Sequence, residues 1–426
     1  MAMVARKFRI LYHNVDQGVF CTGSLLDEET NAKFNYVYIG ASQEYIPTSP
    51  SAGITFNYYE DIDLLVLADF NISHIKRMIA LIKMAKVRVV VYPYMAPVQR
   101  QVVLQEALAA AEEDEDLKTF LNDPYRFFKS QQIIFVYPLM GNGPQYEPSE
   151  EENYHCFELV NEEELKFATE LEGYFQPIVR AGYMAEKNWL MFMGCYGLDL
   201  KTVRDFSVAA EAENRILNEG KMDCVKTERQ MAFSYLSKFG RSSFGTIVLY
   251  SSLLNEGPSV DDCMLMVKTM GSSKMCNPVL TPESELCSAY CMYKGDHDYC
   301  KHHNQISMSH HIQGTLLLGN LNINKYCKEF SDRFSSISKY IRFYAIPNNG
   351  NIENWDNMLT DWSVKGHRKY WIGNSMSDAR VIKDIVSADP NNRFMTYDGV
   401  SGVCIYGFYT KLNKERQQNK SNERQL

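Results

Sequence analysis

The stretch EDIDLLVLADFNISHIKRM, residues 60–78, decides the fold of this chain. Its apolar run from Ile62 to Leu67 predicts a buried strand, because a strand covered on both faces loses the alternation of apolar and polar residues. A short polar loop follows the run, and a helix is expected to begin near His74. Taken alone, this pattern predicts an ordinary strand–helix unit of an α/β protein.

The composition indicates a globular chain with a packed core. Of the 426 residues, 45% are apolar and 12% are aromatic. The formal net charge of −8 argues against nucleic-acid binding over the whole surface, although a local basic patch stays open. No apolar stretch reaches about 18 residues, so no membrane span is expected. The first residues lack the pattern of a signal peptide, and the eleven cysteines are therefore expected to be reduced thiols in the cytoplasm.

The order of the predicted elements indicates one main domain with insertions. Strand and helix patterns alternate from the start of the chain, which predicts a single α/β domain over residues 1–410. Residues 155–240 are mostly helical by pattern and charge, and they are expected to form a helical insertion or cap. A second insertion, rich in Cys and His, is expected over residues 270–312. The polar residues 411–426 are expected to be a disordered tail.

Five segments, taken together and in order, resemble the metallo-β-lactamase superfamily. They are the stretch 60–78, HNVDQGVFCTGSL from His13, YVYIGAS from Tyr36, GTLLLGNLN from Gly314 and FYAIPNNGNIENW from Phe343. The resemblance covers most of residues 8–405. It implies an αββα four-layer sandwich, in which two sheets lie face to face with helices outside, and a helical insertion.

The resemblance also implies a cleft that has lost its metal ligands. The superfamily holds two zinc ions with a His-x-His-x-Asp-His motif, a later Gly-Asp and a Pro-His-His-Gly-Ser loop. The residues that fall at these positions are Asp69, Asn71, Ser73, His74, Asn320, Asn348 and Asn349. Zinc sites are built from thiolate, imidazole and carboxylate donors, and the neutral amide of Asn is a poor substitute. The implied protein is a pseudoenzyme with a degenerate cleft, no catalytic residue and no cofactor there, because no metal would activate a water molecule.

Two alternatives to this assignment stay open. The segment CMYKGDHD, residues 291–298, also contains a Gly-Asp pair after an apolar and aromatic stretch. Asp296 is therefore a second candidate for the carboxylate that bridges both metals in the superfamily. The longer predicted strand before Asn320 favours Asn320 for that position. Asp69, Asp296 and Asp378 are also candidates for an oxygen-rich site that would suit magnesium or manganese. These three carboxylates are dispersed in the sequence, so a solvated surface role is the competing interpretation.

A cluster of cysteines and histidines follows residue 270. Cys287, Cys291, Cys300 and His302 could close a tetrahedral structural zinc site. Their spacing is not one of the strong zinc patterns, and the competing interpretation is a loop with free thiols and solvated histidines. A four-ligand zinc site would stabilise an insertion and would not catalyse a reaction.

The functional expectation is binding. The resemblance implies a scaffold, sensor or regulatory subunit with a protein partner or self-association, such as those of bacterial anti-phage defence operons. The alternative is a metal-dependent phosphodiesterase or nuclease-type hydrolase with an altered metal site. A third hypothesis is a cleft that binds a nucleotide or another small polar ligand without hydrolysing it.

The apolar segment NWLMFMGCYGL, residues 188–198, contains the candidate partner surface. Trp189 and Phe192 are of the types enriched in the centres of protein interfaces. The competing interpretation is that they pack the insertion onto its own domain, because a lone monomer seldom exposes so large an apolar patch.

Overall fold

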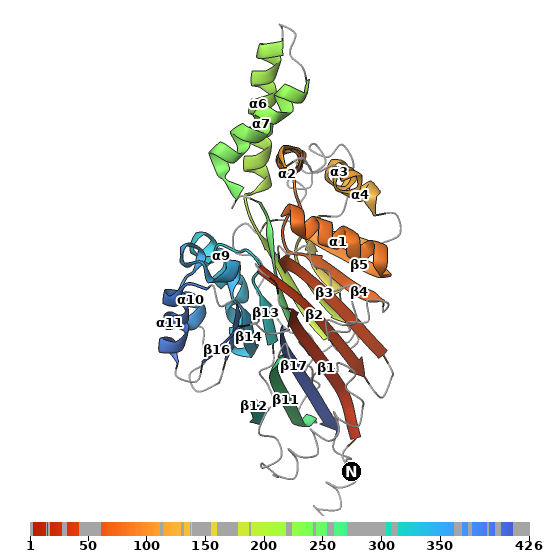
Figure 1. The fold of residues 1–426 in the computed structure, drawn as a ribbon, viewed down its shortest axis with the longest axis vertical. Coiled ribbons are helices and arrows are strands. Elements are labelled where there is room, and N and C mark those ends of the chain that lie inside the picture. The colour runs from red at the N-terminus through yellow and green to blue at the C-terminus, as the bar shows by residue number, and fades with distance from the viewer. Residues whose placement is uncertain are drawn as a thin grey trace, which may run out of the picture.

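The computed structural model describes twenty parts of the chain. They are residues 3–13, 15, 18–27, 32–41, 61–110, 114–128, 132–136, 138, 155–159, 178–186, 189–218, 224–241, 244–253, 260–270, 304–307, 314–361, 369–373, 377–389, 392–396 and 402–411. Within them the chain is an α/β protein with two mixed six-stranded sheets and helices, which confirms the α/β class (Figure 1). No helix of these residues is long and apolar enough to cross a membrane.

The first sheet is formed by the N-terminal strands in sequence order. They are β1 (Met3–His13), β2 (Gly18–Asp27), β3 (Ala32–Ala41), β4 (Ile62–Leu67), β5 (Val87–Pro93) and β6 (Gln132–Val136). The first two pairings are antiparallel, and the other three are parallel. The predicted strand in the opening stretch is β4, with the predicted bounds. Apart from the half-buried Asp63 it is apolar, because neighbours on both sides and cover on both faces leave it buried.

The second sheet repeats this order of pairings. It contains β9 (Trp189–Tyr196), β10 (Thr246–Leu253), β13 (Gly314–Leu317), β14 (Ile341–Ala345), β15 (Tyr370–Gly373) and β16 (Arg393–Thr396). Again two antiparallel pairings are followed by three parallel ones. The two halves of the protein are therefore built on the same strand plan.

The remaining strands connect and extend the two sheets. β8 (Ile178–Glu186) pairs with β6, with β9 and with β7 (His155–Leu159). β17 (Gly402–Lys411) pairs with β1 and with β11 (Val260–Met270), which also pairs with β12 (Asn304–Ser307). β16 and β17 follow one another in the sequence, but each pairs with other strands.

The helices lie on opposite flanks of the strands. α1 (Ile72–Met84), α2 (Pro97–Ala109), α3 (Glu115–Asn122) and α4 (Pro124–Phe127) follow strands of the first sheet, and α9 (Ile323–Phe334), α10 (Met358–Asp361) and α11 (Ala379–Ala388) follow strands of the second. Three short 3-10 helices, η4 (Ser335–Tyr340), η5 (Pro347–Gly350) and η6 (Ile352–Asn354), also lie in the second half. Figure 1 shows α1 on one side of the strands and α9–α11 on the other.

Two hydrophobic clusters fill the space around the second sheet. Ile247 and Leu249 of β10 belong to the cluster that contains the side chains of the first sheet. Their neighbours Val248 and Tyr250 point to the opposite face, into the cluster that contains the apolar side chains of α9 and α11. This alternation follows from the two-residue period of a strand. One face of β10 therefore packs toward the first sheet and the other toward helices.

The region 155–240 differs from the expected helical insertion. Its first part holds the strands β7, β8 and β9. Among the described residues of this region, the helices are α6 (Leu200–Asn218) and α7 (Cys224–Phe239), which project from the body as a hairpin (Figure 1). The run Met191–Tyr196 of β9 is buried, and a short run that is apolar on both faces does not distinguish a buried strand from a buried helix.

The other predicted segments are described only in part. In the predicted insertion 270–312, the structure describes Met270, at the end of β11, and β12. Lys411 belongs to β17, and the rest of the predicted tail lies outside the described residues.

Candidate functional site

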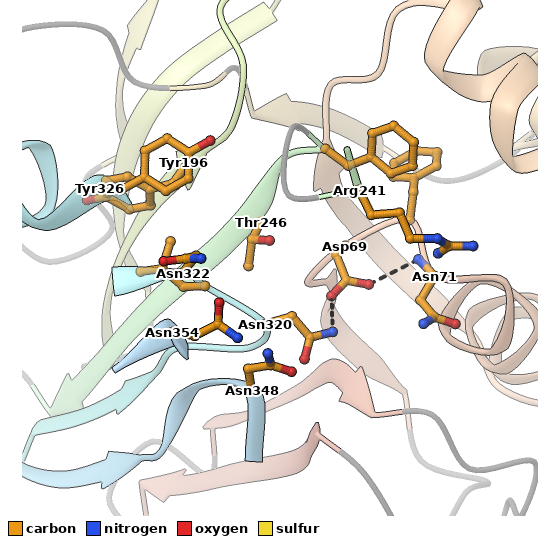
Figure 2. A pocket seen from close by; sticks show the side chains of 13 residues that line it. Asp69, Asn71, Tyr196, Arg241, Thr246, Asn320, Asn322, Tyr326, Asn348 and Asn354 are labelled. Atoms are coloured by element: carbon orange, nitrogen blue, oxygen red, sulfur yellow. Dashed lines mark hydrogen bonds between the residues drawn. The ribbon is translucent and has the colours of Figure 1, made fainter. Parts of the chain in front are cut away.

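A pocket opens where the carboxyl ends of parallel strands from both sheets meet. Asp69 follows β4, Asn320 follows β13 and Asn348 follows β14. The cavity has a volume of about 340 Å³. It is lined by Asp69, Phe70, Asn71, Tyr196, Arg241, Phe244, Thr246, Asn320, Leu321, Asn322, Tyr326, Asn348 and Asn354. Figure 2 shows the polar side chains of this set around the cavity.

Asp69 is a buried carboxylate whose two oxygens are both hydrogen-bonded. Its Oδ1 accepts from the backbone N–H of Asn71 at 3.0 Å and from Nδ1 of His74 at 2.6 Å. Its Oδ2 accepts from Nδ2 of Asn320 at 2.7 Å. Burial by itself raises the pKa of Asp69, but the charge of His74 and the three hydrogen bonds together outweigh burial and lower that pKa. Asp69 is therefore an ionised group held by the protein.

The residues after Asp69 act locally on the start of α1. Asn71 is the N-cap, and its Oδ1 accepts from the backbone N–H of Ser73 at 3.1 Å and from the Ser73 hydroxyl at 2.8 Å. Asn and Ser are favoured there because they satisfy backbone donors that the helix leaves free. His74 is buried, and its Nδ1 contacts the carboxylate of Asp69. It therefore has a structural role in fixing Asp69, which the sequence did not reveal. Asn71 lines the pocket, whereas Ser73 and His74 do not.

The two later loops reach the pocket through unusual backbone conformations. Gly319 has a φ of +53°, and a Cβ there would lie 2.6 Å from the hydroxyl of Tyr38. Asn348 has a φ of +44° and donates its backbone N–H to the carbonyl of Gly319 at 2.8 Å. Asn is one of the few residues other than Gly that tolerates this region. An Asn at 348 is thus explained in part by the backbone alone. The side chain of Asn349 lies outside what the structure describes.

Several lining residues were not found from the sequence. Asn322 is the N-cap of α9 and accepts from the backbone N–H of Lys325 at 3.0 Å, a role that its position before a helix could have indicated. Tyr196, Arg241, Thr246 and Asn354 had no such local signal. Of these, Tyr196 is 1% exposed, and its hydroxyl has no hydrogen-bond partner among the described residues. Burial also raises the pKa of Tyr196 well above its usual value, so the hydroxyl stays protonated.

The side chains of the pocket offer hydrogen bonds more than charge. Asp69 is the one carboxylate among the described lining residues, and Arg241 is the one cation. Arg241 is paired with Glu106, with Nη2 and Oε2 separated by 2.5 Å. Within the described parts of the chain, no group of three or more His, Cys, Asp or Glu side chains could hold a metal ion. Asp69 accepts three hydrogen bonds, so it has one acceptor site left, on Oδ2, to offer to a cation.

The other predicted site residues lie elsewhere. Asp378 is the N-cap of α11, where its carboxylate binds the backbone N–H and the guanidinium of Arg380. Phe192 is 3% exposed, and its ring packs on Phe334 with the ring centroids 5.1 Å apart. This side chain therefore packs inside its own protein. The proposed structural zinc ligands and two further side chains lie outside what the structure describes; they are Cys287, Cys291, Cys300, His302, Asp296 and Trp189.

Comparison with known proteins adds no family to this picture. No protein-family model and no curated protein matches the chain.

Proposed function

We propose that this chain is a non-catalytic protein of the metallo-β-lactamase-like fold that acts by binding. In this proposal the two sheets and their flanking helices form the αββα sandwich, and the pocket is the degenerate cleft of that fold. The repeated strand plan, the shared cluster between β10 and the first sheet, and the helices on opposite flanks support the architecture.

The observation that carries the proposal is the state of Asp69. In a hydrolytic metal site this carboxylate would face a cation together with several imidazoles or carboxylates. Here the neighbouring positions are Asn71, Asn320 and Asn348, and both oxygens of Asp69 are occupied by protein donors. An amide at 320 that donates to Asp69 stabilises the carboxylate in the way that a metal would, without providing a nucleophile.

The position of the pocket supports binding. Ligands of open α/β sheets sit outside the carboxyl ends of parallel strands, and the loops after β4, β13 and β14 meet there. A role as scaffold or regulatory subunit, including one in a bacterial anti-phage defence assembly, rests on the sequence resemblance alone. A metal-dependent hydrolase remains the competing function.

A turnover assay separates the two functions. The full chain is incubated with bis(4-nitrophenyl) phosphate, single-stranded DNA and a chromogenic β-lactam, each with zinc, manganese or magnesium added. We expect no turnover above that of buffer and metal, because the pocket holds one engaged carboxylate. Asn320→Ala serves as the matched variant.

The hydrolase function would gain support from one pattern of results. Metal-dependent turnover by the wild-type protein that disappears in Asn320→Ala would place a reaction in this pocket and refute the proposal. Turnover that is equal in both proteins would indicate a contaminant or a reaction elsewhere, and the pocket would then still have no catalytic role.

A further inference from the structure

The pocket contains no charge that lacks an internal counterpart among the described residues. The carboxylate of Asp69 accepts hydrogen bonds from three protein donors, one of them His74, and the guanidinium of Arg241 is paired with Glu106. Transferring an ionic ligand from water into such a site costs its hydration without supplying a partner. The arrangement therefore favours an uncharged ligand.

One wall of the pocket is the side chain of a buried tyrosine. Tyr196 lines the cavity, as Figure 2 shows. Its hydroxyl has no hydrogen-bond partner in the described structure, but that atom is sealed from solvent. A ligand in the cavity would therefore meet the ring of Tyr196 and not its hydroxyl.

The asparagines add donors and acceptors in fixed directions. Asn71 and Asn322 spend their Oδ1 atoms on helix caps, which leaves their Nδ2 donors available to the cavity. Asn348 and Asn354 make no side-chain hydrogen bond to described residues, so each keeps both a donor and an acceptor. In Figure 2 the side chains of Asn320, Asn348 and Asn354 converge on one region of the cavity. The lining is thus an array of neutral groups of both kinds.

We propose that this pocket binds an uncharged, polyhydroxylated ring, either a free monosaccharide or the ribose of a nucleoside. A hydroxyl both donates and accepts, so adjacent hydroxyls on one ring match carboxamides that present both groups. The cavity of about 340 Å³ lies near the lower end of the roughly 300–1,000 Å³ range of ligand pockets, which suits one ring system. This inference rests on the proposed non-hydrolytic function and names its ligand class.

The test is a binding titration of the full chain with four probes: D-ribose, D-glucose, adenosine and adenosine 5′-monophosphate. Binding is followed by ligand-observed NMR and by the shift in melting temperature at millimolar probe. We expect at least one uncharged probe to bind and the phosphorylated probe to bind about tenfold more weakly than adenosine. Binding of both free sugars points to a monosaccharide, and binding of adenosine alone to a nucleoside.

Two variants connect binding to this pocket. Asn354→Ala removes one carboxamide from the lining, so its affinity should fall about five- to tenfold, the effect of one hydrogen bond, while its melting temperature changes little. Asn348→Gly should behave alike, because glycine keeps the positive φ of this position. Asn324→Ala is the control, because Asn324 is exposed and binds the carbonyl of Glu353 outside the pocket lining.

Three results would overturn the ligand class. They are tighter binding of the phosphorylated probe than of adenosine, unchanged affinity in both pocket variants, and no binding of any uncharged probe. Chemical conversion of a bound probe would instead refute the non-hydrolytic function and leave the ligand class standing.

Discussion

Replacing Asn320 with Asp tests the central contact of the pocket. The change converts the donor that faces Asp69 at 2.7 Å into a second carboxylate. Two unit charges about 4 Å apart repel by about 4 kcal/mol at an effective dielectric constant of 20. This energy corresponds to a pKa rise of about 3 units for one carboxyl of the pair. We therefore expect Asn320→Asp to lower the free energy of unfolding by about 4 kcal/mol at pH 7.

The sign of the pH dependence follows from this raised pKa. The unfolded chain ionises the new carboxyl near its usual pKa of about 3.9, whereas the folded protein resists ionisation until about pH 7. The penalty relative to wild type is therefore full above pH 7 and falls below about 1 kcal/mol near pH 4. Urea unfolding of both proteins, followed by the fluorescence of the buried Trp355 and Trp371, measures the difference at each pH.

Asn322→Asp is the matched control for this experiment. Asn322 lines the same pocket, but it caps α9. Asp is as good an N-cap as Asn and interacts favourably with the helix dipole, so this variant should stay within about 0.5 kcal/mol of wild type. The reasoning fails if Asn320→Asp costs no more than the control at pH 7, or if its penalty is unchanged at pH 4.

Three further changes test other features of the described structure. Burial, together with the nearby cations, lowers the pKa of His13 from 6.5 to about 3. Between these two pH values the unfolded chain binds more protons than the folded protein, so the free energy of unfolding should fall as the pH drops below 6.5. His13→Gln should recover about 2 kcal/mol at pH 5, measured by urea unfolding. Because φ of Asn348 is +44°, Asn348→Gly should keep the melting temperature while Asn348→Ala should lose about 1–2 kcal/mol, and equal melting temperatures would contradict the positive φ. Gly319→Ala should lower the free energy of unfolding by about 2–4 kcal/mol, from backbone strain and from the clash with Tyr38. Gly240→Ala is the control, because Gly240 has a φ of +68° and open space around it, so this variant should show the strain alone. Similar losses of stability in the two variants would exclude the clash.

Local patterns were sufficient for many elements, and their failures have a physical cause. The strand Ile62–Leu67 and the helix after it could be predicted because an apolar run interrupted only by Asp63 and an N-cap are local signals. The region 155–240 was expected to be mostly helical, and its described residues include the strands β7, β8 and β9 as well as two helices. The run Met191–Tyr196 of β9 lies buried between β8 and β10, and pairing with distant strands is invisible to a local pattern.

The candidate site divides in the same way. Asp69, Asn71, Asn320 and Asn348 were expected to lie together, and all four line the pocket; that they serve a function stays a prediction. Tyr196 was not found, because nothing local marks a buried tyrosine whose side chain lines a cavity.

The sequence by itself determined the α/β class, the position of its main strands and helices, and the Asn-rich character of the loops that end them. Those properties depend on periodicity, capping and residue type, which neighbouring residues establish. Only the tertiary structure decided that Asn320 donates to Asp69, a contact between residues 251 positions apart. It also placed Tyr196 at the wall of the cavity. Such contacts depend on how two sheets pack and on which groups each loop turns inward, and these are set by the whole core at once.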